Sequence, residues 1–270
     1  MSKLVVVYLI SIYDNRDNLK KFINHYLNFD AGSKHELVIC FKNFNEQDDI
    51  FQTPELKQIK YTKFLDNNKF NDYDWGSYYR VSKKYFDKII FYMNCHCRPL
   101  VNNWLKIFED NYSEKSLLGA AGSYESMVNS ALKGKHTKSK LKSIIYAISN
   151  FVDFPIFPNP HIRSNCFMIS ANNFLELEFN KYYKFKKKGT WVNESGRKGM
   201  TNQLKKKKFN IYVINSDGHK FEEKQWQLSE TYALNQQSKL IIGDKFSSIY
   251  AKKSIGEKLS FQNHIWKNTN

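Results

Sequence analysis

The segment Lys88–Leu105, KIIFYMNCHCRPLVNNWL, guides the interpretation of the whole chain. Five consecutive apolar residues, Ile89–Met93, are followed at once by a polar cluster. A run of this length without alternation is typical of a central strand that is covered on both faces. Ligands in open α/β sheets bind just beyond the carboxyl ends of such strands. We therefore expect a substrate site at the residues that follow, which include Asn94, Cys95, His96 and Arg98.

Strand-like and helix-like segments alternate over the first 122 residues. Such alternation predicts an α/β fold of the Rossmann-like class, with a mostly parallel central sheet flanked by helices. The predicted strands are Leu4–Ile10, Glu36–Phe41, Ile59–Thr62, Lys88–Met93 and Leu117–Gly122, and the predicted helices include Tyr73–Phe86 and Asn102–Phe108.

The pattern changes in the second half of the chain. Lys135–Phe151 has the spacing of a basic amphipathic helix with Leu141, Ile144, Ile145 and Ile148 on one side. Three of the five prolines follow in Phe154–His161, which predicts an extended or turning segment. The remaining predicted elements are a strand at Asn165–Ser170, helices at Asn172–Leu177 and Thr201–Lys207, and a strand at Asn210–Ile214. No clear linker interrupts the chain, so we expect one domain over residues 1–270.

The chain is strongly basic. Forty-two Lys and Arg against 26 Asp and Glu give a net charge of +16, which favours polyanionic partners such as nucleic acid, an anionic membrane surface or phosphorylated substrates. Specific nucleic-acid readers depend on arginine, and only five of these residues are arginines. A solvated lysine-rich surface without a polyanionic partner is the alternative interpretation.

Cysteine usage and hydropathy point to a thiol-reduced, cytoplasmic protein. Four cysteines in 270 residues do not make a disulfide framework. The apolar stretch Leu4–Ile10 is short and lacks a small-residue cleavage site, and no apolar run approaches the roughly 18 residues of a spanning helix.

Several catalytic motifs are weak or missing. Cys95-His96-Cys97 lacks the second ligand pair of a closed zinc site, and adjacent side chains on an extended chain point apart, which argues against a Cys-His nucleophile pair. Neither a dinucleotide fingerprint nor a P-loop follows a predicted strand. A dehydrogenase or a P-loop kinase is therefore not expected.

Two further segments carry candidate functional groups. His161, Arg163 and Asn165 immediately precede an apolar strand. Glu194 and Ser195 precede a predicted helix whose amino end could attract anions. Glu194 is an isolated carboxylate in a basic stretch, which fits a helix cap or a surface ion pair as well as a general base.

Taken together, these segments resemble bacterial glycosyltransferases of the GT-A fold, and most closely the transferases of surface-polysaccharide clusters. The resemblance covers roughly residues 1 to 250. It is carried by the amino-terminal strand, Asp66, the block Asp74–Tyr78, the strand and cluster Phe91–Pro99 with Trp104, and the segments His161–Ile169 and Glu194–Thr201.

The resemblance implies a nucleotide-diphosphate sugar as donor and a glycan or lipid-linked acceptor, as in the synthesis of capsule or lipopolysaccharide. It implies a nucleotide-sugar-binding half at residues 1–122, an acceptor and catalytic half at 123–250 and a tail at 251–270. The implied donor-binding residues are Asp66, Asp74, Ser77, Tyr78, Asn94, His96, Arg98 and Asn165. The implied catalytic residues are Glu194, Arg163 and His161, with Glu194 as base for the acceptor hydroxyl.

One departure from the family pattern concerns the metal. Many GT-A enzymes hold Mn²⁺ or Mg²⁺ with an Asp-x-Asp, where this chain has Asn94-Cys95-His96. These side chains are poor ligands for hard cations. The enzyme would then work without a metal, hold the ion differently, or have a degenerate site. Without a metal, Arg98, Arg163, His96 and His161 are the candidates for neutralising the departing diphosphate.

Two alternatives remain at this point. A non-catalytic nucleic-acid-binding module would expose its aromatic residues along a basic groove, whereas most aromatic residues here have the spacing of a core. An inactive glycosyltransferase-like assembly partner would explain the missing acidic pair. For Lys135–Phe151, core packing competes with peripheral contact to an anionic membrane.

Overall fold

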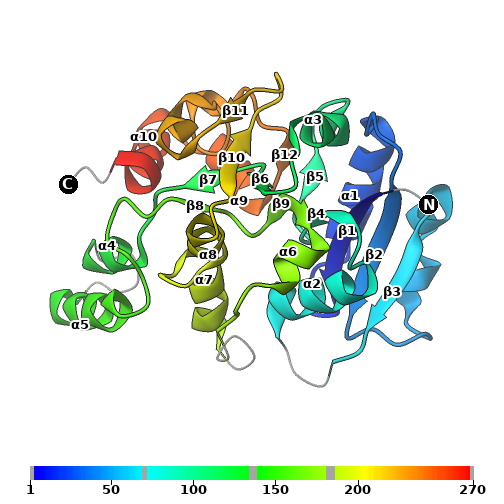
Figure 1. Ribbon diagram of the computed structural model, residues 1–270, viewed down its shortest axis with the longest axis horizontal. Coiled ribbons are helices and arrows are strands. Elements are labelled where there is room, and N and C mark those ends of the chain that lie inside the picture. The colour runs from blue at the N-terminus through cyan, green and yellow to red at the C-terminus, as the bar shows by residue number, and fades with distance from the viewer. Residues whose placement is uncertain (1–2, 69–71, 134–138, 181–185, 268–270) are drawn as a thin grey trace.

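The computed structural model describes residues 3–68, 72–133, 139–180 and 186–267 (Figure 1). The strands are β1 (Leu4–Ser11), β2 (Glu36–Lys42), β3 (Thr62–Asp66), β4 (Ile89–Met93), β5 (Arg98–Pro99), β6 (Ser116–Gly119), β7 (Gly122–Ser123), β8 (His161–Ile162), β9 (Cys166–Ser170), β10 (Asn210–Ile214), β11 (Lys220–Phe221) and β12 (Ile242–Gly243). Eight of them form one sheet in the order β11-β10-β6-β9-β4-β1-β2-β3.

The central sheet is mostly parallel. β1, β2, β3 and β4 pair in parallel, as do β6 and β10. β9 lies antiparallel between β4 and β6, and β11 is antiparallel at one edge. The predicted α/β class with a mostly parallel sheet is confirmed.

Helices cover both faces of this sheet (Figure 1). α1 and α3 pack on one face, and α2, α6 and α8 pack on the other. The α-helices are α1 (Asp17–Asn28), α2 (Tyr73–Lys84), α3 (Trp104–Asn111), α4 (Met127–Leu132), α5 (Lys140–Phe151), α6 (Ala171–Leu175), α7 (Lys187–Ser195), α8 (Met200–Lys206), α9 (Lys245–Ala251) and α10 (Ile255–Gln262).

The central strands are buried on both sides, as their unbroken apolar runs predict. In β4, Ile90 and Tyr92 belong to one core cluster, whereas Phe91 and Met93 belong to the cluster on the opposite face. Successive side chains of a strand point to opposite faces, so only a strand covered on both sides needs apolar residues at every position.

Some predicted boundaries are wrong. β3 is Thr62–Asp66 instead of Ile59–Thr62, because it pairs with β2 from Val38 to Lys42 and so continues to the end of its neighbour. The segment Leu117–Gly122 is divided between β6 and β7, which belong to different sheets.

The predicted helix Lys135–Phe151 also differs from the structure. α5 begins at Lys140, and residues 134–138 lie outside the described part of the chain. Its interpretation as an ordinary core helix is wrong, because Ile144, Ile145 and Ile148 are exposed. The residues of α5 that are buried are Ser143, Ala147 and Asn150.

Candidate active site

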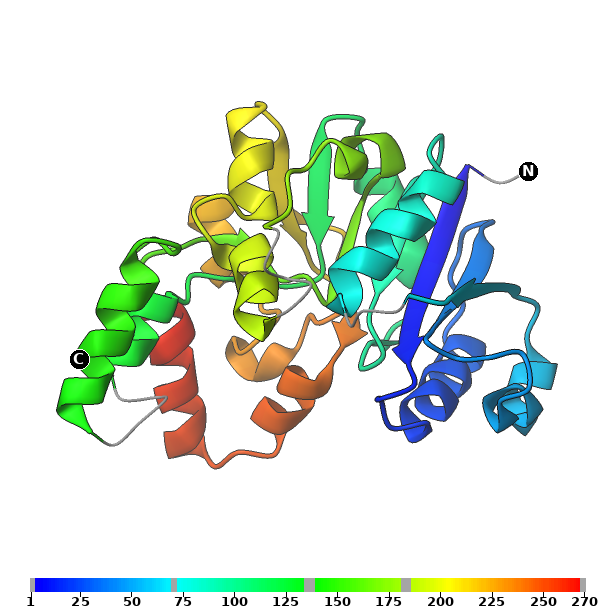
Figure 2. The ribbon, with the colours of Figure 1, turned by 90° about the horizontal axis from the view of Figure 1, so that it is seen from below.

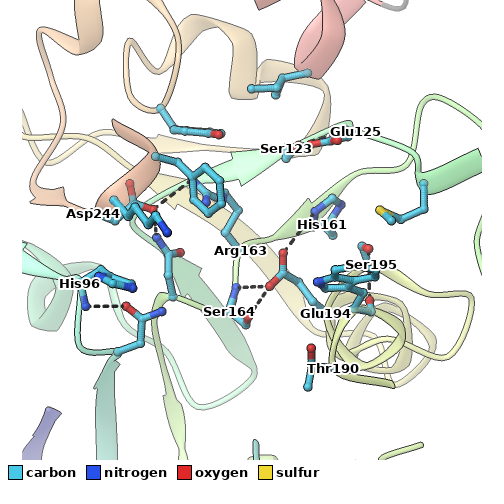
Figure 3. Close-up of a pocket in the computed structure, with 18 of the residues that line it drawn as sticks. His96, Ser123, Glu125, His161, Arg163, Ser164, Thr190, Glu194, Ser195 and Asp244 are labelled. Atoms are coloured by element: carbon cyan, nitrogen blue, oxygen red, sulfur yellow. Dashed lines mark hydrogen bonds and ion pairs between the residues drawn. The ribbon is translucent and has the colours of Figure 1, made fainter. Parts of the chain in front are cut away.

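A pocket of about 480 Å³ lies beyond the carboxyl end of β4 (Figure 3). Segments that are distant in sequence build its walls: the loop after β4, the β8–β9 loop, α7, the start of α9 and the carboxyl-terminal helices. The predicted site residues in its lining are Asp74, Asn94, His96, His161, Arg163, Asn165 and Glu194. The pocket thus collects groups from both halves of the chain.

The antiparallel direction of β9 brings the first two of these segments together. Met93 at the end of β4 is paired with Cys166 at the start of β9. The pairing continues by one residue, since the Asn94 N–H donates to the Asn165 carbonyl at 2.9 Å. The residues that precede β9 therefore lie at the same edge as the residues that follow β4.

Arg163 is the most buried cation of the pocket. Its guanidinium lies 3.9 Å from the centroid of the Tyr232 ring, and Nη1 lies 3.2 Å from Oδ2 of Asp244. Nη1 nevertheless has no well-aligned hydrogen bond within the described residues. Burial alone would lower the pKa of Arg163, but the surrounding negative groups, including Asp244 and Glu194, keep it above its usual value. Arg163 is therefore permanently charged, and its Nη1 can donate a hydrogen bond to a ligand.

Asp244 also holds Asn165 in place. The carboxylate accepts from the Asn165 side-chain amide and, at 2.6 Å, from the backbone N–H of Ser247, so that it caps α9. The Asn165 Oδ1 atom is buried and lacks a partner in the described structure. A buried acceptor without a hydrogen bond destabilises a protein. Such an atom is expected in a binding site, where a ligand can donate the missing hydrogen bond.

Glu194 belongs to the last turn of α7 and is partly exposed to the pocket (Figure 3). Its Oε2 accepts from the Ser164 hydroxyl and, at 3.3 Å, from the Ser164 N–H. Glu194 precedes the predicted helix, which is α8 from Met200, but it also lies in a helix that was not predicted, because α7 continues to Ser195. The carboxylate is positioned by the β8–β9 loop and by its own helix.

His161 faces the other oxygen of this carboxylate. Its Nε2 lies 3.8 Å from Glu194 Oε1, and its Nδ1 lies 2.7 Å from the Asn159 carbonyl. A carbonyl only accepts, so Nδ1 carries a proton. Burial lowers the pKa of His161, while the Glu194 charge opposes this effect. A neutral His161 then presents an Nε2 lone pair that can stabilise a proton taken up by Glu194.

Asp74 has a raised pKa. Burial raises its pKa to about 6, and repulsion from Asp14 and Glu194 adds to the shift, while Lys42 and a hydrogen bond from Asn94 oppose it. Asp74 lies in the first turn of α2 and lines the pocket. It is therefore a carboxyl group that changes protonation near neutral pH.

Four residues expected to bind the donor lie outside the pocket lining. Asp66 and Ser77 belong to a buried network in which Arg80 donates to Asp66 and Ser77 donates to Asp66 at 2.5 Å. Tyr78 is buried between aromatic rings of the core. Arg98 lies in β5 and donates to the Ser248 hydroxyl at 2.9 Å. The contacts of these four side chains are with other protein groups, so they serve the stability of the fold instead of lining the pocket.

Several pocket residues were not predicted from the sequence, and the most important are Ser164, Asp244, Tyr232 and Glu125. Asp244 had a signal similar to that of Asn94, since it directly follows the short strand β12 and is separated from the apolar run Leu240–Ile242 only by Gly243. Glu125 pairs with His264 at 3.0 Å. The local sequence around Glu125 and His264 gave no indication that these two residues are in contact.

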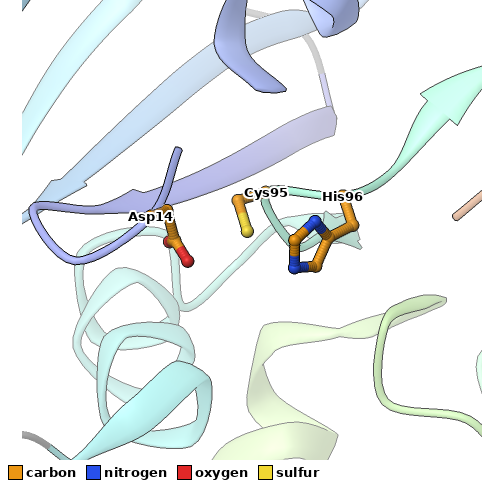
Figure 4. A group of neighbouring side chains, drawn as sticks. All are labelled: Asp14, Cys95 and His96. Carbon is orange, nitrogen blue, oxygen red and sulfur yellow. The ribbon is translucent and has the colours of Figure 1, made fainter. Parts of the chain in front are cut away.

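The residues at the position of the family's metal motif do not fit a hard cation. Asp14, Cys95 and His96 lie within 4.8 Å of one another and offer one oxygen, one sulfur and one nitrogen (Figure 4). Burial, together with the nearby Asp14 charge, raises the pKa of Cys95 well above its usual range, so the group remains a thiol. Mg²⁺ and Mn²⁺ prefer carboxylate oxygens, of which this group supplies only one.

The cysteines of this segment are also unsuited to nucleophilic catalysis. Cys97 is buried, and its thiol donates to the Asn165 carbonyl at 3.1 Å. Burial raises the pKa of Cys97 as well as that of Cys95. A nucleophilic cysteine needs a lowered pKa, so neither thiol is activated.

No family model matches this sequence, and no curated protein matches it. Solved structures do match. The mannosyltransferase Ktr4p from S. cerevisiae is 9% identical with a TM-score of 0.38, over 71% of this chain and 62% of that chain. HddC from Yersinia pseudotuberculosis is 8% identical with a TM-score of 0.40, over 74% of this chain and 96% of that one.

A third match is a protein described as a nucleotide-diphospho-sugar transferase from Desulfovibrio desulfuricans G20, at 12% identity and a TM-score of 0.32, over 44% of this chain and 59% of that chain. The present chain thus spans about three fifths of the length of the yeast enzyme. Similarity of this degree concerns the path of the chain and assigns no role to any residue.

Proposed function

We propose that this protein is a glycosyltransferase that moves a sugar from a nucleotide-diphosphate sugar to a glycan or lipid-linked acceptor of a surface polysaccharide. The observation that carries the proposal is that one pocket holds both the Glu194 carboxylate and the Arg163 guanidinium. Sugar transfer needs these two functions at once: a base for the attacking hydroxyl and positive charge for the leaving diphosphate.

The remaining lining suits a carbohydrate. Carboxylates, amides and hydroxyls that can bond sugar hydroxyls alternate with apolar and aromatic surface, as in most small-molecule sites. Trp191 and Phe246 are partly exposed at this pocket and can cover the apolar face of a sugar ring. Asp74 and Asn94 come from the amino-terminal half, so we assign them to the donor.

The reaction is proposed as a direct displacement. Glu194 takes the proton of an acceptor hydroxyl while that oxygen bonds to the anomeric carbon. The bond from the anomeric carbon to the diphosphate breaks, and the leaving group keeps the electron pair. Arg163, with Lys245 at the same pocket, neutralises the charge that develops there. His161 stabilises the proton on Glu194, and the sugar inverts its configuration.

The decisive experiment combines donor binding with transfer. We expect one member of a panel of sugar nucleotides to raise the melting temperature, and to do so equally with and without EDTA, because the donor set at Asp14, Cys95 and His96 does not suit Mg²⁺ or Mn²⁺. If no sugar nucleotide binds, the proposal falls, and an inactive assembly partner becomes the better explanation.

Glu194→Gln tests the base. We expect transfer to fall by about 10²- to 10⁴-fold, the usual contribution of general base catalysis, with donor affinity unchanged. Glu176→Gln is the matched control, because Glu176 is an exposed carboxylate paired with Lys207 and is not part of the pocket lining. Wild-type transfer rates in Glu194→Gln would remove Glu194 from the mechanism.

A further inference from the structure

Helix α5 presents its apolar side to solvent. Leu141, Ile144, Ile145 and Ile148 have the i, i+3, i+4, i+7 spacing of a single helical face, which Phe151 continues. Four of these five residues are more than half exposed, and Ile144 is exposed to 48%. We call these five residues the α5 stripe.

The opposite side of the helix faces the protein and is small or polar. Ser143, Ala147 and Asn150 are buried, and Ala147 packs in a small cluster with Val128 and Val192. A helix of a soluble protein normally buries its apolar side. The reversed orientation of α5 leaves a contiguous apolar surface that lacks cover among the described residues, which is typical of an interaction site.

The charges around the stripe identify its partner. Between Glu125 and Asp153 the sequence holds five lysines and no acidic residue. Of these lysines, Lys140 and Lys142 lie on α5 itself and are exposed. An apolar face bordered by lysines without carboxylates is suited to the surface of an anionic bilayer, where apolar side chains enter the acyl boundary and lysines meet the headgroups.

A second copy of the chain is a poorer partner for this surface. A symmetric dimer through the α5 stripe would bring the lysines of both copies to one interface, and the segment between Glu125 and Asp153 holds no acidic residue to pair with them. No helix in the described part of the chain is both long enough and apolar enough to span a membrane. α5 has 12 residues, or about 18 Å of helix.

The stripe is connected to the candidate active site. α4 and α5 lie at the end of the molecule remote from β3 (Figures 1 and 2). Met127, the first residue of α4, lines the pocket, and Val192 of α7 packs against the α4–α5 pair two residues before Glu194. A bilayer that contacts α5 would therefore lie one helix layer from the carboxylate.

We propose that the α5 stripe docks this protein on an anionic membrane and so presents the pocket to an acceptor carried by a lipid. The choice of acceptor rests on the proposed function, whereas the docking does not. The inference deepens the proposed function by selecting a lipid-linked acceptor over a soluble glycan.

Vesicle sedimentation with the full chain tests the docking. We expect the protein to sediment with vesicles of phosphatidylcholine that contain about one third phosphatidylglycerol, and weakly with phosphatidylcholine alone. Ile145→Glu combined with Ile148→Glu should weaken binding at least tenfold, because two charges would enter the acyl boundary. Leu27→Glu is the matched control, since Leu27 is an exposed leucine on α1.

The outcomes separate the two proposals. Absence of sedimentation with anionic vesicles, or unchanged sedimentation of the double variant, would overturn the docking and leave the sugar transfer intact. A dimer seen by light scattering and abolished by the double variant would also overturn it, in favour of a second copy. Vesicle binding by a protein that binds no sugar nucleotide would sustain the docking and refute the proposed function.

Discussion

Two groups of charged side chains in this molecule differ in how completely they are paired. The first, which we call the paired network, joins Lys42 and Asp66 at the ends of β2 and β3 with Asp72, which precedes α2, and Arg80 within α2. Two cations meet two carboxylates there, and Arg80 donates to both. The second group is the pocket.

The pocket leaves some of its polar atoms without partners. Nη1 of Arg163 and Oδ1 of Asn165 are buried, and within the described chain neither makes a hydrogen bond. Asp74 carries a carboxyl group whose pKa is raised to about 6, since burial disfavours its charge. The difference shows two uses of buried charge. Charged groups that pair with one another stabilise the fold, whereas polar and charged groups at a cavity that lack protein partners can bind a ligand.

The largest effect on stability should come from breaking the paired network. Asp66→Ala leaves the buried Lys42 and the partly exposed Arg80 with one carboxylate fewer, so we expect a loss of about 3–5 kcal/mol in the free energy of unfolding. Denaturant titration measures this loss. The control is Asp49→Ala, which removes an exposed pair with Arg16 and should change nothing measurable. Equal effects of the two variants would contradict the comparison.

Arg163→Lys should sharpen the contrast, because it keeps the charge but removes the fork of donors. We expect donor affinity to fall about tenfold, or about 1.4 kcal/mol, with a smaller change in stability than that of Asp66→Ala. Calorimetry with the donor found in the panel measures the affinity. Arg197→Lys is the control, since the Arg197 guanidinium donates to the Phe151 carbonyl at the surface and is not part of the pocket lining. Unchanged affinity in Arg163→Lys would remove the guanidinium from the donor site.

The effect of Asp74→Asn should depend on pH. The folded-state pKa of about 6 exceeds the ordinary value of 3.8, so the native state binds this proton more tightly than the unfolded state. The resulting stability is present below about pH 4 and is lost as the pH rises through about 6. We therefore expect Asp74→Asn to be the more stable protein by up to about 2 kcal/mol at about pH 8, and equal to the wild type near pH 4. A difference that does not change with pH would show that the pKa of Asp74 is the same in the native and the unfolded states.

Part of this structure was predictable because local sequence carries it. An apolar residue at every position of Ile89–Met93 required a strand covered on both faces, and polar residues after it required an exposed end. The same reasoning located Asn94 and His96 at the pocket. The amphipathic spacing of Lys135–Phe151 likewise predicted a helix, which the structure shows from Lys140 to Phe151, although it did not predict the side that this helix buries.

The sequence by itself therefore determined the α/β class, the central strands and most of the polar segments that meet at the pocket. Tertiary structure alone decided that β9 runs antiparallel, which places Arg163 and Asn165 beside Asn94 instead of at the opposite edge. It also decided that Asp66 and Ser77 pair internally and that α5 turns its apolar side outward. The physical reason is that the periodicity of apolar residues indicates which side chains must be buried. Strand direction and side-chain pairing depend instead on residues that are distant in the sequence.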